Sequence, residues 1–266
     1  MTNIKYASLL LGLLTLPLLF NFAPLEILRL KTFDALVQTP EPSGHFTILN
    51  ITEEDVELKG GYPFPRQDLA NIHIDLLNKG ALGVGWVILF PQDDRFGGDK
   101  IFADVLSYAP SVLAMPEFDN GIYTETHGTV ILGPDVDLPK AKGFLQNIKP
   151  LSESATQGAV SAPVDVDNLV RRLPLLQQTP DGWVASFGIQ VLKSLVEGTT
   201  YQIKTNDIGI EWVRIPAYDK ISTLNNGTVY NTYWNKFKRV SIGDIRGENI
   251  SPGSILIVGP TFEGTN

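Results

Sequence analysis

Residues 60–90, GGYPFPRQDLANIHIDLLNKGALGVGWVILF, constrain the fold more than any other stretch of the sequence. Pro63 and Pro65 fix their own φ angles, and each pushes the residue before it out of the helical region. The chain is therefore extended through this segment, and a helix can begin only at about Arg66. The two prolines thus predict a sharp boundary in front of a helix.

The residues on either side of that boundary predict one unit of an α/β sheet. Apolar residues recur at helical spacing until the Lys-Gly pair at 79–80 ends the pattern. The next run, 81–90, is apolar on both faces, which is typical of a strand buried in a parallel sheet. The apolar run at 45–51 supplies a strand before the helix. Residues 45–90 therefore predict a βαβ unit with a right-handed crossover.

The following residues repeat this pattern. An acidic, glycine-containing loop leads to a predicted helix at about 99–108 and a strand at 111–118. The resulting β-α-β-α-β order predicts an α/β fold with an open, mainly parallel sheet flanked by helices. Residues 119–163 are rich in Pro, Gly and Ser, and predict a long irregular connection with a short strand at 129–133.

The rest of the chain predicts an additional β-rich portion. The alternating sequence LVRRLPLL at 169–176 predicts a strand, and its proline indicates an edge position. Further predicted elements are a helix at 183–198, β structure at 208–218 and 227–234, a helical turn and loop at 241–254, and a final buried strand at 255–260.

The N-terminus predicts one transmembrane helix. Residues 6–25 are apolar and uncharged, and about 20 such residues are enough to cross a bilayer. The segment lacks an A-x-A-like cleavage site, so we expect an uncleaved signal anchor. Lys5 on one side and Arg29 and Lys31 on the other do not decide its orientation. The short N-terminal tail favours a single-pass protein of the cell membrane with its domain outside the cytoplasm, in the periplasmic or extracellular space.

Composition excludes several classes of function. The net charge is −8 and no basic cluster occurs beyond Arg171-Arg172, so we expect no nucleic-acid partner. The absence of cysteine excludes thiol catalysis, disulfides and cysteine-based zinc sites. The three histidines are too scattered to indicate a metal site, and no nucleophile elbow, P-loop or dinucleotide fingerprint is present. We therefore expect no enzymatic activity, no metal and no cofactor.

Charged residues near the predicted strand ends are the candidates for ligand binding, because ligands of open α/β sheets bind at the carboxyl ends of the strands. An acidic rim there suits a cation or a cationic ligand, but acidic residues also solvate loops and cap helices, and we favour a capping role for Asp99. Arg66 suits either an anionic ligand or pairing with the acidic loops, and we favour the pairing. The candidates at these strand ends are Glu53, Asp55, Asp93, Asp94 and Asp99; the other candidate residues are Arg66, Asp165, Asp167 and Arg171.

Asp165 and Asp167 also permit a different interpretation. In a strand, residues two apart face the same side, so the two carboxylates could hold a metal ion. Some glycosyltransferases use such an Asp-x-Asp pair to bind a metal-bound nucleotide sugar. An exported, metal-dependent transferase therefore remains an alternative.

Four stretches in order resemble the CHASE2 domain, an extracytoplasmic sensory module of bacterial signalling receptors. They are YPFPR at 62–66, GALGVGWVILF with the following DDRFGGD at 80–99, VDVDNLVRRLPLL at 164–176, and SILIVGPTFEGT at 254–265. The sequence departs from the family pattern at three places. Thr52 followed by Glu53 stands where we expect an acid, Trp86 replaces an aspartate, and Asn168 replaces a glycine.

The resemblance implies a sensory domain at about 33–266, behind the predicted anchor at 6–25. Receptors of this family usually continue into further membrane spans and a cytoplasmic kinase or cyclase, neither of which is present in these 266 residues. We therefore expect a sensor that lacks its own output domain, binds an unknown small molecule or protein, and works with a kinase or cyclase partner. A structural envelope subunit that binds other proteins is a further alternative.

Overall fold

The computed structural model describes residues 6, 23–37, 41–122, 128–138, 140–196, 200–231, 237–247 and 250–262. The predicted membrane anchor at 6–25 falls mostly on residues 7–22, which lie outside this set. No helix within the described ranges is both long and apolar enough to cross a bilayer.

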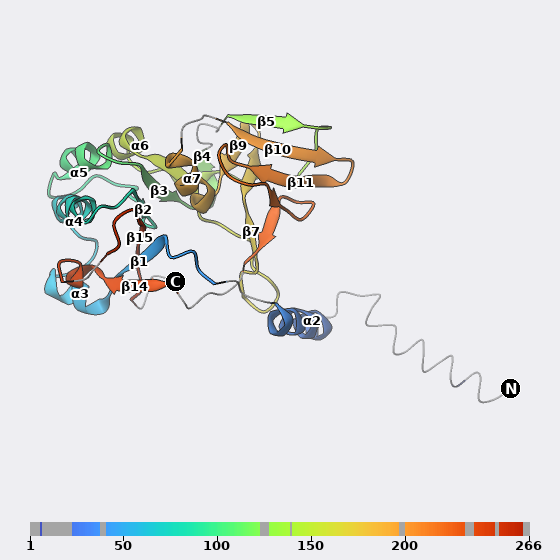
Figure 1. Ribbon diagram of the computed structural model, residues 1–266, viewed down its shortest axis with the longest axis horizontal. Coiled ribbons are helices and arrows are strands. Elements are labelled where there is room, and N and C mark those ends of the chain that lie inside the picture. Colours follow the sequence, from blue (N-terminus) through green and yellow to red (C-terminus); the bar gives the residue numbers. More distant parts are fainter. Residues whose placement is uncertain are drawn as a thin grey trace.

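A six-stranded sheet forms the centre of the molecule, with the strand order β14-β1-β15-β2-β3-β6 (Figure 1). All of its pairings are parallel, which confirms the predicted parallel sheet. The strands of the predicted βαβ unit, β1 and β2, are not neighbours, because β15 lies between them. The strands are β1 (Phe46–Ile51), β2 (Gly83–Trp86), β3 (Ser111–Met115), β6 (Thr156–Ala159), β14 (Lys238–Ser241) and β15 (Ile255–Pro260).

Helices cover both faces of this sheet. Three helices pack on one face: α4 (Arg66–Asn78), α5 (Asp99–Leu106) and α6 (Lys149–Ser154). The helix α7 (Phe187–Ser194) packs on the other face. Side chains along β15 alternate between the two faces of the sheet, so this strand contributes to the core on each face. Leu256 and Val258 join the core under α4 and α5, whereas Ile255 and Ile257 face α7. Two further helices are α2 (Ala23–Leu36) and the short α3 (Glu53–Leu58).

The β-rich portion contains a four-stranded sheet with the order β12-β11-β10-β5. Its core includes Tyr201, Ile203 and Trp183, and Ile189 of α7 joins it, so α7 lies between the two cores. This arrangement confirms the predicted β-rich addition. The strands here are β4 (Glu117–Ile122), β5 (Thr129–Leu132), β7 (Arg172–Pro174), β8 (Leu176–Thr179), β9 (Gly182–Ala185), β10 (Tyr201–Asn206), β11 (Gly209–Arg214), β12 (Ile221–Ser222) and β13 (Thr228–Tyr230).

Three local predictions were wrong. The region 119–163 is more regular than expected, because it contains α6 and the sheet strand β6. The residues of β6 have little intrinsic preference for strand structure, and pairing with β3 makes them a strand. The helix predicted at 183–198 begins only at Phe187, since the residues before it pair with β8. The strand predicted at 169–176 is divided between β7 and β8.

We predict opposite effects for two glycine substitutions at the contact between β6 and α7. A Cβ added at Gly158 would lie 2.5 Å from the Cα of Phe187, so Gly158→Ala must push strand and helix apart and should cost about 1–3 kcal/mol of stability. Gly188 has no atom within 4 Å of such a Cβ, so Gly188→Ala should be neutral or stabilising by up to about 1 kcal/mol. Thermal unfolding measures both, and equal melting temperatures would contradict the prediction.

Candidate functional site

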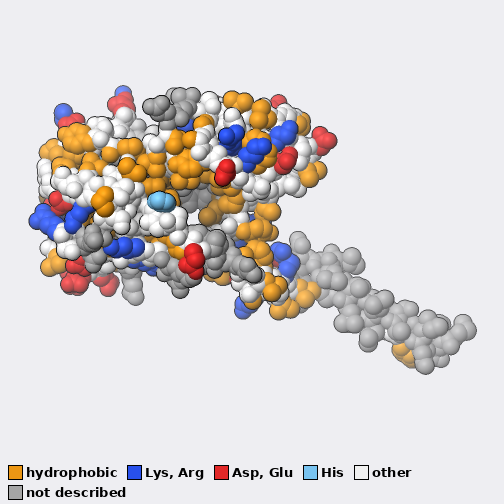
Figure 2. Space-filling model, viewed as in Figure 1, with side chains coloured by type: hydrophobic (Ala, Val, Ile, Leu, Met, Phe, Trp, Pro, Cys, Tyr) orange, Lys and Arg blue, Asp and Glu red, His pale blue; other side chains and the backbone are white. Residues whose placement is uncertain are grey.

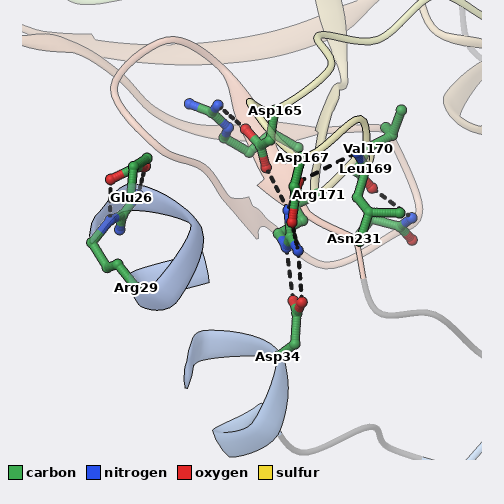
Figure 3. A network of polar contacts seen from close by, with 10 residues as sticks. Glu26, Arg29, Asp34, Asp165, Asp167, Leu169, Val170, Arg171 and Asn231 are labelled. Carbon is green, nitrogen blue, oxygen red and sulfur yellow. Dashed lines mark hydrogen bonds and ion pairs between the residues drawn. The ribbon is translucent and has the colours of Figure 1, made fainter. Parts of the chain in front are cut away.

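A buried arginine, Arg171, is the centre of the largest charged cluster around the predicted site residues (Figure 3). Its side chain is only 1% exposed. Nε and Nη2 donate to the two carboxylate oxygens of Asp34 at 2.8 and 2.7 Å, and Nη1 and Nη2 donate to those of Asp167 at 2.8 Å each. Asp165 accepts from Arg171 Nη1 at 3.3 Å, and its other oxygen bonds Arg172. We call these five residues the Arg171 cluster.

A turn brings the two aspartates of the Asp-x-Asp pair together. The N–H of Asn168 donates to the carbonyl of Asp165, and the N–H of Asp165 donates to the carbonyl of Leu169, both at 2.9 Å. Asn168 has a φ of +62°, a left-handed conformation that glycine and asparagine adopt more readily than other residues. The two aspartates therefore lie in a turn, so the geometry that the metal-binding alternative requires, two carboxylates on one side of a strand, is not present. The asparagine that replaces the glycine of the family pattern meets the same backbone requirement.

Electrostatics favours the ionised state of Asp34, Asp167 and Arg171. Hydrogen bonds from Arg171 hold the pKa of Asp34 and of Asp167 below the ordinary value of 3.8. The bonds to Asp34 and Asp167 in turn raise the pKa of Arg171. Both carboxylates that the transferase hypothesis assigns to a metal are thus engaged by guanidinium groups. In the described part of the chain, no group of three acidic or histidine side chains is arranged to hold a metal ion.

Asp34 joins the helix α2 to the body of the domain, and the sequence analysis did not single it out. It lies on the last turn of α2, where Phe33 also packs on Tyr230 with ring centroids 4.6 Å apart. On the same helix Leu25, Leu28 and Leu36 are exposed, and Figure 2 shows hydrophobic side chains at its surface. Because Asp34 and Arg171 are 137 residues apart, no local pattern relates them.

Arg66 forms a second cluster with two of the predicted aspartates. Its backbone N–H donates to Asp94 Oδ2 at 3.1 Å, and the N–H of Gly98 donates to the same oxygen at 3.0 Å. Its guanidinium Nε lies 3.4 Å from Asp99 Oδ1. Burial would raise the pKa of Asp94, but these backbone donors lower it. The pairing of Arg66 with the acidic loop is therefore confirmed.

Asp99 lies in the first turn of α5, as expected for a carboxylate at a helix start, but it does not cap the helix, and Asp94 has a related role. The N-cap of α5 is Gly98, which has no side chain to accept a hydrogen bond. Asp99 is the first helical residue, and its Oδ2 accepts from the backbone N–H of Asp94 at 2.7 Å. Asp94 instead receives the first N–H of α4, from Arg66. These contacts hold the loop after β2 against two helix starts.

The remaining candidates lie elsewhere. Asp55 is 4% exposed and accepts from Thr52, whose side chain in turn caps α3. Asp55 also accepts from Ser241 Oγ at 2.9 Å and from the N–H of Gly243 at 3.0 Å, so it joins α3 to β14. The motif Thr52-x-x-Asp55 is a capping box that the sequence alone could have revealed. Glu53 and Asp93 are exposed on the surface.

Trp86, which stands at an aspartate position of the family pattern, belongs to the core. It is fully buried, and its Nε1–H donates to Nδ1 of His73 at 3.3 Å. Burial lowers the pKa of His73 to about 4, so the ring is neutral near pH 7. At this strand position a buried aromatic side chain therefore packs in the core where the family pattern has an aspartate.

These observations describe a mixed α/β domain in which charged clusters hold loops and the helix α2 in place. The sequence model of the CHASE2 domain family matches residues 8–266, so this chain belongs to the CHASE2 family. CHASE2 is a family of sensory domains of signalling receptors. The search of curated proteins and the search of solved structures found no match.

We predict that Asp34→Asn loosens α2. The substitution removes the charge that docks the helix on Arg171, which should cost about 1–2 kcal/mol of docking free energy. Hydrogen exchange of the α2 amides should then accelerate about 5- to 30-fold, while α5 is unchanged. The matched control is Glu26→Gln, because Glu26 forms only a local, exposed pair with Arg29 on the same helix. Unchanged α2 exchange in Asp34→Asn would contradict the prediction.

The same contact predicts a dependence on acid pH. The pKa values of Asp34 and Asp167 are lowered in the folded state, so their contribution is complete above the ordinary value of 3.8 and is lost as pH falls through the lowered values. The difference in melting temperature between the wild type and Asp34→Asn should be constant from about pH 5 to 7 and shrink below about pH 4. A difference that persists unchanged at about pH 2.5 would show that the charge of Asp34 is not its source.

Proposed function

We propose that this chain is the sensory part of a membrane receptor, anchored by the apolar segment at residues 6–25 with its domain outside the cytoplasm. Membership of the CHASE2 family supports a sensory role. The observation that carries the proposal is the bidentate contact between Asp34 and Arg171. It ties α2, which begins within the last residues of the predicted anchor, to a buried side chain of the domain body.

This contact offers a route for a signal. A ligand or protein partner that favours a different arrangement of residues 165–172 would move Arg171, and Asp34 and α2 would follow it. Such a ligand shifts the equilibrium only by the difference in its affinity for the two arrangements. Because a helix moves as a rigid element, a displacement of α2 reaches the segment before it. We propose a kinase or a cyclase as the output that receives this displacement.

The location can be tested with single cysteines, because the natural chain has none. Lys100 on α5 has a side chain that is 85% exposed, so Lys100→Cys should react with a membrane-impermeant maleimide in intact cells. The matched control is Ala103→Cys on the same helix, where the residue is 5% exposed and should stay unlabelled in the folded protein. Labelling of Lys100→Cys only after lysis would place the domain in the cytoplasm and refute the proposed location.

A further inference from the structure

A cavity of about 410 Å³ lies where residues 88–96, which follow β2, meet the Tyr-Pro-Phe-Pro-Arg segment before α4. This is the carboxyl edge of the parallel sheet, where open α/β sheets bind ligands. Nine of the residues lining the cavity are apolar or aromatic, and its volume is within the range of small-molecule sites. The lining includes four aromatic side chains, Tyr62, Phe64, Phe90 and Phe96, and two cationic ones, Arg66 and Arg95.

Arg66 is a buried cation with incomplete hydrogen bonding. The residue is 7% exposed, and its one side-chain hydrogen bond, from Nη2 to the carbonyl of Gln92, is long at 3.4 Å. Its Nε and the facing Asp99 Oδ1 are both buried without a hydrogen-bond partner. Burial lowers the pKa of Arg66 despite the nearby carboxylates. An additional anion beside this guanidinium would therefore be stabilised.

Two arginines and two aspartates line the cavity, so its formal charges balance, and the position of the arginines against the aromatic rings favours an anion over a cation. The guanidinium of Arg66 lies 4.4 Å from the ring centroid of Phe90, and that of Arg95 lies 4.6 Å from the ring centroid of Phe96. Both rings thus already have a cation over one face, which leaves less room for a cationic ligand. Of the two acidic residues in the lining, Asp94 is engaged by backbone N–H groups, and Asp93 is exposed.

We propose that this cavity binds a small organic anion, a carboxylate carried on an apolar or aromatic body, with Arg66 and Arg95 facing the carboxylate and the aromatic walls holding the body. This inference deepens the proposed sensory function and takes its physiological meaning from it. A carboxylate suits the site because guanidinium groups bind it through paired, charge-assisted hydrogen bonds. The apolar walls distinguish such a ligand from an inorganic anion, which has no surface to bury.

The test uses the full chain in lipid nanodiscs, with empty nanodiscs as the blank. Ligand-observed fluorine NMR would follow 4-fluorophenylacetate, its neutral counterpart 4-fluorophenylacetamide, and competition by inorganic phosphate. We expect the acid to bind at least tenfold more tightly than the amide, and phosphate to displace it only weakly. Arg66→Gln should weaken binding of the acid about tenfold or more.

Two further variants keep the test decisive if Arg66→Gln fails to fold. Arg95 is exposed, so Arg95→Gln should fold normally and weaken the acid about threefold to tenfold. Arg239 on β14 is also exposed and does not line the cavity, so Arg239→Gln should leave binding unchanged.

Three results would overturn the proposal: no binding of the acid up to about 10 mM, equal binding of acid and amide, or equal binding by the wild type and Arg95→Gln. Displacement by phosphate as effective as by the acid itself would overturn the requirement for an apolar body. None of these results bears on the maleimide labelling of Lys100→Cys. The proposed location therefore stands or fails independently of the ligand class.

Discussion

A guanidinium that loses its water must be matched by carboxylates, and the cluster around Arg171 meets this demand with side chains from distant parts of the chain. Removing an ionised side chain from water costs several kcal/mol, so an unmatched arginine at this position would destabilise the fold. The turn at 165–168 supplies two carboxylates, and α2 supplies the third. The placement of α2 on the domain therefore depends on charge as well as on the packing of Phe33 and Leu30.

Helix α7 belongs to two cores of the molecule. Val191 of α7 packs with the main sheet, and Ile189 packs with the β-rich portion. Gln190, between them, is buried and receives a hydrogen bond from the hydroxyl of Tyr201. Because interiors are packed at high density, a displacement of α7 must affect both sides. The β-rich portion is therefore mechanically continuous with the sheet and is not a loosely attached appendage.

Sequence reasoning recovered the parts of the fold that depend on burial and backbone restriction. Pro63 and Pro65 located the start of α4, and runs that are apolar on both faces identified β2 and β15. The order of the strands in the sheet could not be predicted, because the apolar sequence of 255–260 indicates a buried strand but not which strands lie beside it. The alternation at 169–176 did not reveal that this stretch is divided, because β7 pairs with β13 whereas β8 pairs with β9, and a local pattern does not specify partners.

For the candidate residues too, local patterns could be predicted, whereas contacts between distant residues could not. The Asp-x-Asp pattern singled out Asp165 and Asp167, and both accept hydrogen bonds from Arg171. Asp34 could not be found, because its partner is distant in sequence and its own surroundings on α2 carry no motif. Asp55 and Asp94 were chosen for their position after strands, and both proved to organise helix starts instead. Acidic residues at strand ends thus serve loop structure at least as readily as ligands.

The central position of β15 has a consequence for the order in which the protein can be assembled. The strand pairs with β1 on one side and β2 on the other, so both earlier strands present unpaired edges until residues 255–260 have left the ribosome. Pairing across some two hundred residues is slow, and exposed edges of apolar strands invite association between chains. All residues up to 260 must therefore be synthesised before the sheet can close, and until then the exposed strand edges favour association between chains.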